Sequence, residues 1–369
     1  MRRFTYNRIA AALFLALLST PLCVQLFSGG ASISMAERRA LAPFPSLNEF
    51  YAAPLSYPDK LSRWMEDHLG LRGALTKLYS KLRDELHLED RRFAVRGDDG
   101  WLFLALDQAL LSHQGLNPFA PGEAETWFEN AKRMKDASCG KPFTILIAPD
   151  KHTVYSEKLS RYPRRSGRAT RLETLAALAP EFGIAVSAPV EALRDAKRNT
   201  QVYYRTNSHW TFRGAYEGYR AIAASLKQQG LSIETVDPSR LEPNGEHEAP
   251  QDIYGLLGVE NPPPEMTPNW RIKNAADVIR EDRLEAYDWR SFEAKRWTSS
   301  KEGAPRLIVF GDSFFNALRP FLTESFSSVA FVHHRMGEPP FSALQSCDYD
   351  AVVFEIVERQ LSYPLVFAP

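Results

Sequence analysis

The chain has 369 residues with 44 % hydrophobic, 12 % aromatic and 24 % charged side chains, which is the composition of an ordinary globular protein. Its 45 basic and 45 acidic side chains balance, and this lack of a basic excess disfavours a nucleic-acid-binding protein. One long apolar stretch lies near the N-terminus and no second one follows, which excludes a polytopic channel or transporter.

The apolar stretch covers residues 9–27 and follows arginines at positions 2, 3 and 8. Its 19 residues are about the length that a helix needs to cross a bilayer core. The preceding basic residues favour a cytoplasmic N-terminus and export of the remainder. We therefore predict that residues 1–30 form a transmembrane helix that anchors the chain in the inner membrane. The alternative is a cleaved signal peptide whose processing site lies near the small residues at positions 29–31.

Residues 31–96 are predicted to form a proline-rich juxtamembrane segment followed by a helix. Apolar side chains recur at helical spacing between Leu71 and Leu86. A turn signal at residues 98–100 then precedes a short buried strand over 101–104. A second amphipathic helix is expected from about Glu123 to Met134.

An α/β domain is predicted from residue 97 to 369, because apolar strand-like runs alternate with helical patterns. The apolar runs cover 143–148, 184–186, 307–310, 329–332 and 351–356, and the helical patterns cover 171–181 and 213–227. Continuous apolar runs are typical of strands buried on both faces, which predicts a mostly parallel sheet flanked by helices. The proline- and charge-rich segment 236–300 is interpreted as a long insertion near the site.

Three cysteines are too few for a disulfide framework. Cys23 lies in the predicted anchor, whereas Cys139 and Cys347 each stand a few residues before a predicted strand. The latter two would meet at one edge of the sheet as a disulfide in an oxidising compartment, or remain two buried thiols. No Cys/His cluster has the spacing of a zinc site, and neither a metal nor a cofactor is expected.

The sharpest motif is Gly311-Asp312-Ser313, where the apolar strand over 307–310 ends. Ligands of open α/β sheets bind at the carboxyl ends of strands, so Ser313 stands where a nucleophile belongs. The helix that follows would offer backbone N–H groups to an oxyanion. The alternative is that Asp312 and Ser313 only cap this helix.

A serine nucleophile needs a base, normally a histidine, and an acceptor that orients this base. Among the eight histidines, His209 is distinctive because it lies in a polar and aromatic cluster, residues 203–211, just before a predicted helix. The alternative is that Asn207 and Ser208 only end and cap local structure while His209 packs beside Trp210.

A third candidate segment, Pro149 to Tyr155, follows the first long strand and also points at the crevice of the sheet. Its candidates for substrate contact are Asp150, Lys151 and Tyr155, with His152 as a rival base. A solvated turn is the alternative. Charged residues after the last strand are interpreted as an internal ion pair: Glu355, Glu358 and Arg359.

Further short motifs follow one another along the chain: Glu37-Arg38-Arg39, Leu41-Ala42-Pro43, Asp67-His68, Leu71-Arg72, Gly100-Trp101-Leu102-Phe103 and Gly214-Ala215-Tyr216. With the segments named above, their order and spacing resemble the SGNH-hydrolase-like domain of alginate O-acetyltransferases of the AlgJ and AlgX type. The resemblance covers most of the chain. It implies an exported α/β domain that moves acetyl groups onto exopolysaccharide hydroxyls. It also implies a partner, a polytopic membrane-bound O-acyltransferase that brings the acetyl group across the membrane.

The resemblance also implies roles for individual residues. Ser313 would be the nucleophile that carries the acetyl group, and His209 would be the general base. Trp210 and Asp312, which lie beside these two residues, join Asp150, Lys151 and Tyr155 as expected substrate-binding residues.

Position 207 departs from the family, which has an aspartate where this chain has Asn207. An aspartate would hold the imidazole tautomer and stabilise the imidazolium, whereas Asn207 brings no charge. Three outcomes follow. The enzyme is slow, or another carboxylate (Asp150 or Asp312) serves His209, or the domain binds glycan without catalysis.

The sequence therefore predicts a periplasmic O-acetyltransferase that acts on an exported polysaccharide through a serine acyl-enzyme. One alternative is a carbohydrate acetylesterase, in which water replaces the sugar as acceptor. The other is a glycan-binding accessory subunit, which the asparagine at position 207 favours.

Overall fold

The computed structural model describes residues 39–71, 93–257, 261–284, 294–334 and 341–365, together with positions 14–16, 19–21, 23–24, 33–34, 74, 78 and 259. Contacts divide the chain into two units. The first unit comprises Met1–Asp90 and Tyr254–Pro262, and the second comprises Arg91–Ile253 and Pro263–Pro369.

Two short helices lie in the described part of the first unit. These are α2 (Leu47–Ala52), which begins at a capping box of Ser46 and Glu49, and α3 (Tyr57–His68). Strands β1 (Ile33–Ser34) and β2 (Arg39–Ala40) pair antiparallel. No helix among the described residues has the length and apolarity to span a bilayer. The predicted anchor and the predicted helix over 71–86 lie mostly outside the described residues.

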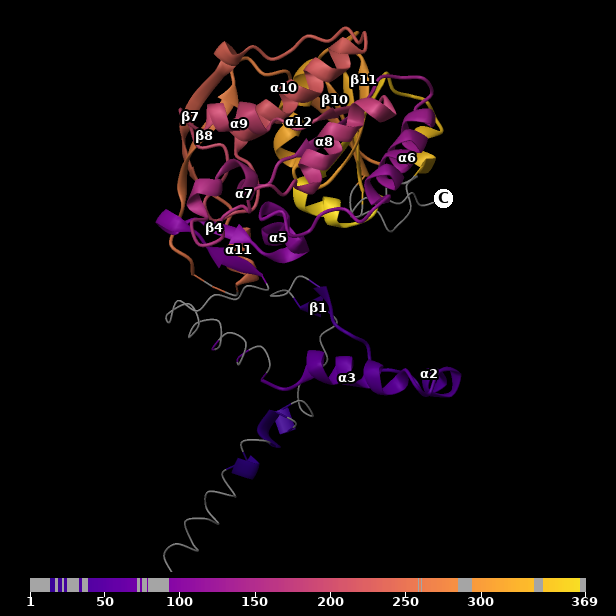
Figure 1. Cartoon of the computed structure of the whole chain (residues 1–369), viewed down its shortest axis with the longest axis vertical. Helices are drawn as coiled ribbons and strands as arrows, with labels where there is room; N and C mark the ends of the chain where they lie inside the picture. The colour runs from indigo at the N-terminus through magenta and orange to yellow at the C-terminus, as the bar shows by residue number, and fades with distance from the viewer. Residues whose placement is uncertain are drawn as a thin grey trace, which may run out of the picture. The chain divides into compact units, whose positions relative to one another are not determined.

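A seven-stranded sheet forms the centre of the second unit (Figure 1). Its order is β6 (Ala185–Ser187), β5 (Phe143–Ala148), β13 (Ala351–Val357), β11 (Arg306–Gly311), β12 (Ser328–His333), β10 (Ala294–Ser299) and β9 (Val278–Arg283). The first five strands are parallel, and β10 and β9 join antiparallel at one edge. The sheet is therefore mixed, and the five parallel strands are those that the apolar runs predict.

The two edge strands come from the segment 236–300, which the sequence analysis interprets as an insertion. Strand β9 is exposed along almost its whole length and carries the charged run Arg280 to Arg283. A strand of this kind shows neither a continuous apolar run nor a clean alternation, and one of these two patterns is needed to recognise a strand from the sequence. The same segment also contributes a hairpin of β7 (Leu241–Glu248) and β8 (Met266–Ile272).

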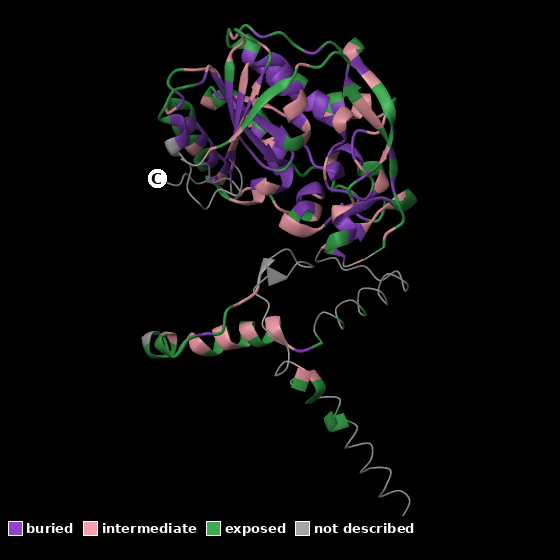
Figure 2. Cartoon of the chain, turned by 180° about the vertical axis from the view of Figure 1, so that it is seen from behind, coloured by how far each residue is buried: buried purple, intermediate pink, exposed green. Residues whose placement is uncertain are grey.

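Helices cover both faces of the sheet. Helices α10 (Phe212–Gln228) and α12 (Phe315–Ser325) pack on the face that carries Leu146, Val309 and Val353. Helix α6 (Glu123–Asp136) and helix α8 (Arg171–Phe182) pack on the opposite face. Every residue of β5 and β13 is buried, and Figure 2 shows the strands as the buried centre of this unit. The shorter elements are α5 (Ala109–His113), α7 (Lys151–Val154), α9 (Val190–Ala196), α11 (Asp252–Leu256) and the hairpin β3 (Ala94–Arg96) with β4 (Leu102–Leu104).

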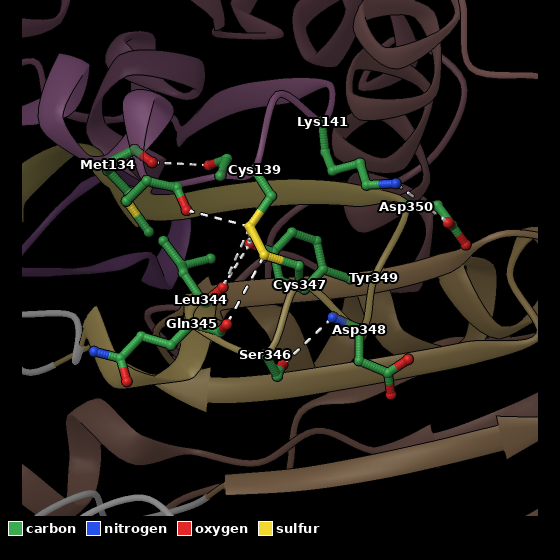
Figure 3. Close-up of a disulfide and its surroundings, with 12 residues drawn as sticks. Met134, Cys139, Lys141, Leu344, Gln345, Ser346, Cys347, Asp348, Tyr349 and Asp350 are labelled. Carbon is green, nitrogen blue, oxygen red and sulfur yellow. Dashed lines mark hydrogen bonds and ion pairs between the residues drawn. A yellow bond between two sulfur atoms is a disulfide. The ribbon is translucent and has the colours of Figure 1, made fainter.

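A disulfide joins Cys139 to Cys347, with their Cα atoms 6.0 Å apart (Figure 3). The two cysteines precede β5 and β13, which are neighbouring parallel strands, so their N-terminal ends meet at one edge of the sheet. The Tyr349 hydroxyl lies 3.6 Å from Cys139 Sγ. The structure thus forms the first of the two alternatives that the sequence leaves open.

We expect the double substitution Cys139→Ser with Cys347→Ser to lower the free energy of unfolding by about 2–5 kcal/mol, because the bond closes a loop of 208 residues in the unfolded chain. Urea unfolding with and without reductant measures this. Wild type in reductant should match the double variant, and the double variant should not respond to reductant. An unchanged wild-type midpoint in reductant would contradict the prediction.

Candidate active site

The two predicted catalytic side chains meet at the carboxyl end of the sheet. Ser313 lies in the turn between the end of β11 at Gly311 and the start of α12 at Phe315, and its side chain is exposed. His209 lies 104 residues earlier, just before α10, and its Nε2 is 2.7 Å from Ser313 Oγ. This distance allows a proton to pass from the hydroxyl to the imidazole.

Hydrogen bonds tie the turn that carries Ser313 to the neighbouring strand β13. Asp312 Oδ1 accepts from Phe314 N at 2.9 Å, and Asp312 Oδ2 accepts from Val357 N at 2.9 Å. Glu355 Oε2 in turn accepts from Asp312 N at 2.9 Å. A Cβ at position 311 would lie 2.8 Å from Glu355 Oε2, so glycine leaves room for this carboxyl group. Asp312 therefore holds the nucleophile turn in place.

Burial raises the pKa of Glu355 well above its ordinary value, and the neighbouring Asp312 raises it further. Burial also raises the pKa of Glu358 to about 7, with a further contribution from Asp150. Beneath the serine turn, burial therefore disfavours the charged form of Glu355, while Asp312 supplies acceptors to two backbone N–H groups.

The far nitrogen of His209 faces two different acceptors. Asn207 Oδ1 lies 2.8 Å from His209 Nδ1 and also accepts from His209 N at 2.9 Å. Asp252 Oδ2 lies 3.5 Å from the same Nδ1. The backbone N–H of Ser208 donates to Asp252 Oδ1 at 2.8 Å, and the Ser208 hydroxyl donates to Asp252 Oδ2. An amide oxygen and a carboxylate thus share the position behind the imidazole.

Asp252 is a site residue that the sequence analysis does not identify. It lies at the start of α11, inside the segment 236–300, and no local motif marks it. Burial alone would raise its pKa, but hydrogen bonds and charge from His209, together with hydrogen bonds from Ser208, lower it below the ordinary value. A second acid from this segment, Glu265, accepts from Arg205 N at 2.7 Å and Thr206 N at 2.8 Å. These two acids of the segment 236–300 therefore hold the loop before His209 through hydrogen bonds.

Lys151 braces this loop from the opposite side. It is 1 % exposed, and its Nζ donates to three backbone carbonyl oxygens, those of Tyr204 at 3.1 Å, Arg205 at 3.0 Å and Asn207 at 2.9 Å. Burial lowers its pKa to about 7, against the opposing charges of nearby carboxylates. Three carbonyl acceptors match the three donors of an ammonium group.

The other predicted substrate-binding residues also lie in the interior. Asp150 Oδ1 accepts from Arg359 Nη1 at 2.6 Å, Tyr155 Oη accepts from Val202 N at 3.1 Å, and Trp210 Nε1 donates to Phe314 O at 3.1 Å. Asp150, Lys151, Tyr155, Trp210 and Asp312 are each no more than 6 % exposed. Their burial assigns them a supporting position, and their contact with substrate stays a prediction.

Three alternatives from the sequence are not supported by the geometry. Asp150 or Asp312 serving His209 is one of the three outcomes that the sequence leaves open, but their oxygens pair with Arg359 and with backbone N–H groups. The rival base His152 is buried, and its Nε2 lies 2.8 Å from the carbonyl oxygen of Leu104. Among the described residues, no group of three His, Cys, Asp or Glu side chains is placed to hold a metal ion.

Residues 94–347 match the family model described as an SGNH hydrolase-like domain, acetyltransferase AlgX. Two curated relatives are called probable alginate O-acetylase AlgJ. That of Pseudomonas putida is 26 % identical over 161 residues (42 % of this chain, 40 % of the relative), and that of Pseudomonas syringae pv. tomato is 26 % identical over 168 residues (44 % and 41 %). The chain thus spans about two fifths of the length of these relatives.

One solved structure with a TM-score above 0.5 supports this fold. Bacillus cereus PatB1 with a sulfonyl adduct superposes with a TM-score of 0.52 at 17 % identity, covering 74 % of this chain and 97 % of that one. The O-acetyltransferase domain of Pseudomonas putida AlgJ gives a TM-score of 0.46 at 20 % identity, covering 73 % and 92 %. Because the family model matches well over half of the chain, the resemblance stated from the sequence is confirmed, and the chain belongs to the SGNH-hydrolase-like AlgX acetyltransferase family.

Proposed function

We propose that this chain transfers acetyl groups to hydroxyls of an exported polysaccharide through an acyl-enzyme on Ser313. The observation that carries this proposal is the 2.7 Å contact between Ser313 Oγ and His209 Nε2, at the carboxyl end of a parallel strand and open to solvent. A hydroxyl becomes a nucleophile when a neighbouring base removes its proton, and this geometry meets that requirement.

The reaction proceeds in two matched steps. Ser313 Oγ attacks the acetyl carbonyl of an ester or thioester donor while His209 Nε2 takes the hydroxyl proton. The bond to the donor's leaving group then breaks, and His209 returns the proton to that group. In the second step a sugar hydroxyl attacks the acetyl carbonyl carbon of the acetyl-serine while His209 takes the sugar proton. The bond between this carbon and Ser313 Oγ then breaks, and His209 returns the proton to Ser313 Oγ.

One backbone donor is placed to stabilise the oxyanion of each step. The N–H groups of Phe314, Phe315 and Asn316 all have acceptors within the turn. In the part of the chain that the structure describes, the N–H of Ser313 donates to no protein acceptor. This donor lies directly beside the attacking oxygen, which is the position that an oxyanion hole requires.

Export and partners form part of the same proposal. The Cys139–Cys347 disulfide supports an oxidising compartment such as the periplasm. We infer that residues 1–30 anchor the chain in the inner membrane, and that a membrane-bound O-acyltransferase supplies the acetyl group. The segments 31–96 and 97–369 would then be the linking segment and the catalytic domain.

Acetyl trapping on the purified full chain tests the proposal. With nitrophenyl acetate as donor, we expect an acetyl-sized mass increase on the peptide that carries Ser313, and faster loss of this label when alginate oligosaccharides are added. The Ser156→Ala variant, which removes another exposed serine, should label normally. Wild-type protein without label on Ser313 would overturn the proposal, and label that passes only to water would instead indicate an acetylesterase.

A further inference from the structure

The carboxylate of Asp252 lies behind the imidazole of His209, beside Asn207, which stands at the position where the resembled family has an aspartate. Asn207 Oδ1 accepts from the backbone N–H of His209, a group that can only donate, so the amide oxygen rather than the amide nitrogen faces the ring. His209 Nδ1 therefore carries the hydrogen in this contact, and Nε2 is free to accept the proton of Ser313. The amide thus sets the tautomer without adding charge.

We propose that Asp252 supplies the negative charge behind His209 while Asn207 orients the ring. Two residues thus perform the two functions, orientation and charge, that a single aspartate would perform. This inference rests on the function proposed above. Asp252 acts through His209 and is a positioning residue, since its carboxylate lies 3.5 Å from Nδ1 on the side away from Ser313.

The carboxylate has a defined place beside the ring. Both of its oxygens accept from Ser208, one from the backbone N–H and the other from the hydroxyl. The same hydroxyl lies 3.3 Å from His209 Nδ1. Ser208, which lies between Asn207 and His209, therefore holds Asp252 close to His209 through these hydrogen bonds. The surrounding donors keep the carboxylate ionised at neutral pH.

The charge matters when the serine proton moves. His209 becomes an imidazolium at that moment, and a carboxylate nearby stabilises it more than a neutral amide does. Two basic side chains also lie near this region. Lys151 binds the carbonyl of Asn207, and Arg359 lies over the ring of Phe314, which packs against His209. Asp252 is the carboxylate that lies beside Nδ1.

Exchanging the amide of Asn207 with the carboxylate of Asp252 tests this proposal. We expect Asp252→Asn to slow acylation of Ser313 by nitrophenyl acetate by about 10²- to 10⁴-fold. The double variant Asn207→Asp with Asp252→Asn should return to within about tenfold of wild type, because the charge is restored on the other side chain. Asp195→Asn, which changes an exposed carboxylate of α9, is the matched control and should acylate normally.

The pH profile separates charge from simple structural support. Loss of the carboxylate should move the acid limb of the acylation rate to lower pH, because the imidazolium loses its neighbouring anion, and the double variant should move it back. Equal slowness of Asp252→Asn and the double variant would overturn the proposal. So would acylation of Asp252→Asn at the wild-type rate, although the acyl-enzyme on Ser313 would then still stand. Absence of label in the wild type would overturn both.

Discussion

Replacing Ser313 by alanine should remove at least about 10⁴-fold of the acetyl-transfer rate, and replacing His209 by glutamine should remove a similar amount. The two side chains act as one unit through the 2.7 Å contact between Oγ and Nε2. The double variant should therefore be no slower than either single variant, because a nucleophile without its base and a base without its nucleophile are equally ineffective.

Initial rates of acetyl transfer at saturating donor, for both single variants and the double variant, measure this effect. Ser156→Ala and His68→Gln are the controls, since one removes a different exposed hydroxyl and the other changes a histidine of the first unit. Multiplicative losses in the double variant would show that the two residues act independently. Full activity of His209→Gln would show that another group takes the proton.

Replacing Arg359 by methionine should lower the free energy of unfolding by about 3–5 kcal/mol at neutral pH. Its guanidinium pairs with Asp150 at 2.6 Å, and the two side chains are only 8 % and 6 % exposed. The substitution leaves the Asp150 carboxylate buried without its cation, and an uncompensated buried charge strongly destabilises a folded protein. The double variant Asp150→Asn with Arg359→Met should recover much of the loss, since neither charge then remains.

Low pH should reduce the loss in free energy of unfolding that Arg359→Met causes. Burial already raises the pKa of Asp150 and the Arg359 charge lowers it, so removing Arg359 raises this pKa further. A carboxyl group whose pKa is higher in the folded than in the unfolded state destabilises the fold as pH rises, so the deficit shrinks as pH falls. Urea unfolding at pH 5 and pH 7.5 measures the difference.

A surface variant, Arg198→Met, should change stability by less than about 1 kcal/mol, because its pair with Asp195 is exposed. A loss below about 1 kcal/mol at pH 7.5 for Arg359→Met would contradict the expectation.

The core of the second unit is readable from the sequence because of where its strands lie. Strands β5, β11 and β13 are covered on both faces, so their residues form continuous apolar runs, and α6, α8 and α10 carry one apolar face each. The antiparallel strands β9 and β10 are not recognised in the sequence, because β9 is largely charged and exposed at the edge of the sheet and β10 has no continuous apolar run. The pairing of β10 with β12 and of β9 with β10 comes from tertiary packing alone.

The candidate site likewise contains residues that the sequence identifies and one residue that only the tertiary structure reveals. Ser313 and His209 each lie next to an element with a strong local pattern, and the sequence therefore determines that both reach the carboxyl end of the sheet. It also shows that position 207 lacks a carboxylate. Asp252 has no local signal, because it lies in a segment without a clear period and becomes a neighbour of His209 only when that segment folds back. Which acid faces the imidazole is decided by packing between distant segments, and only the tertiary structure contains that information.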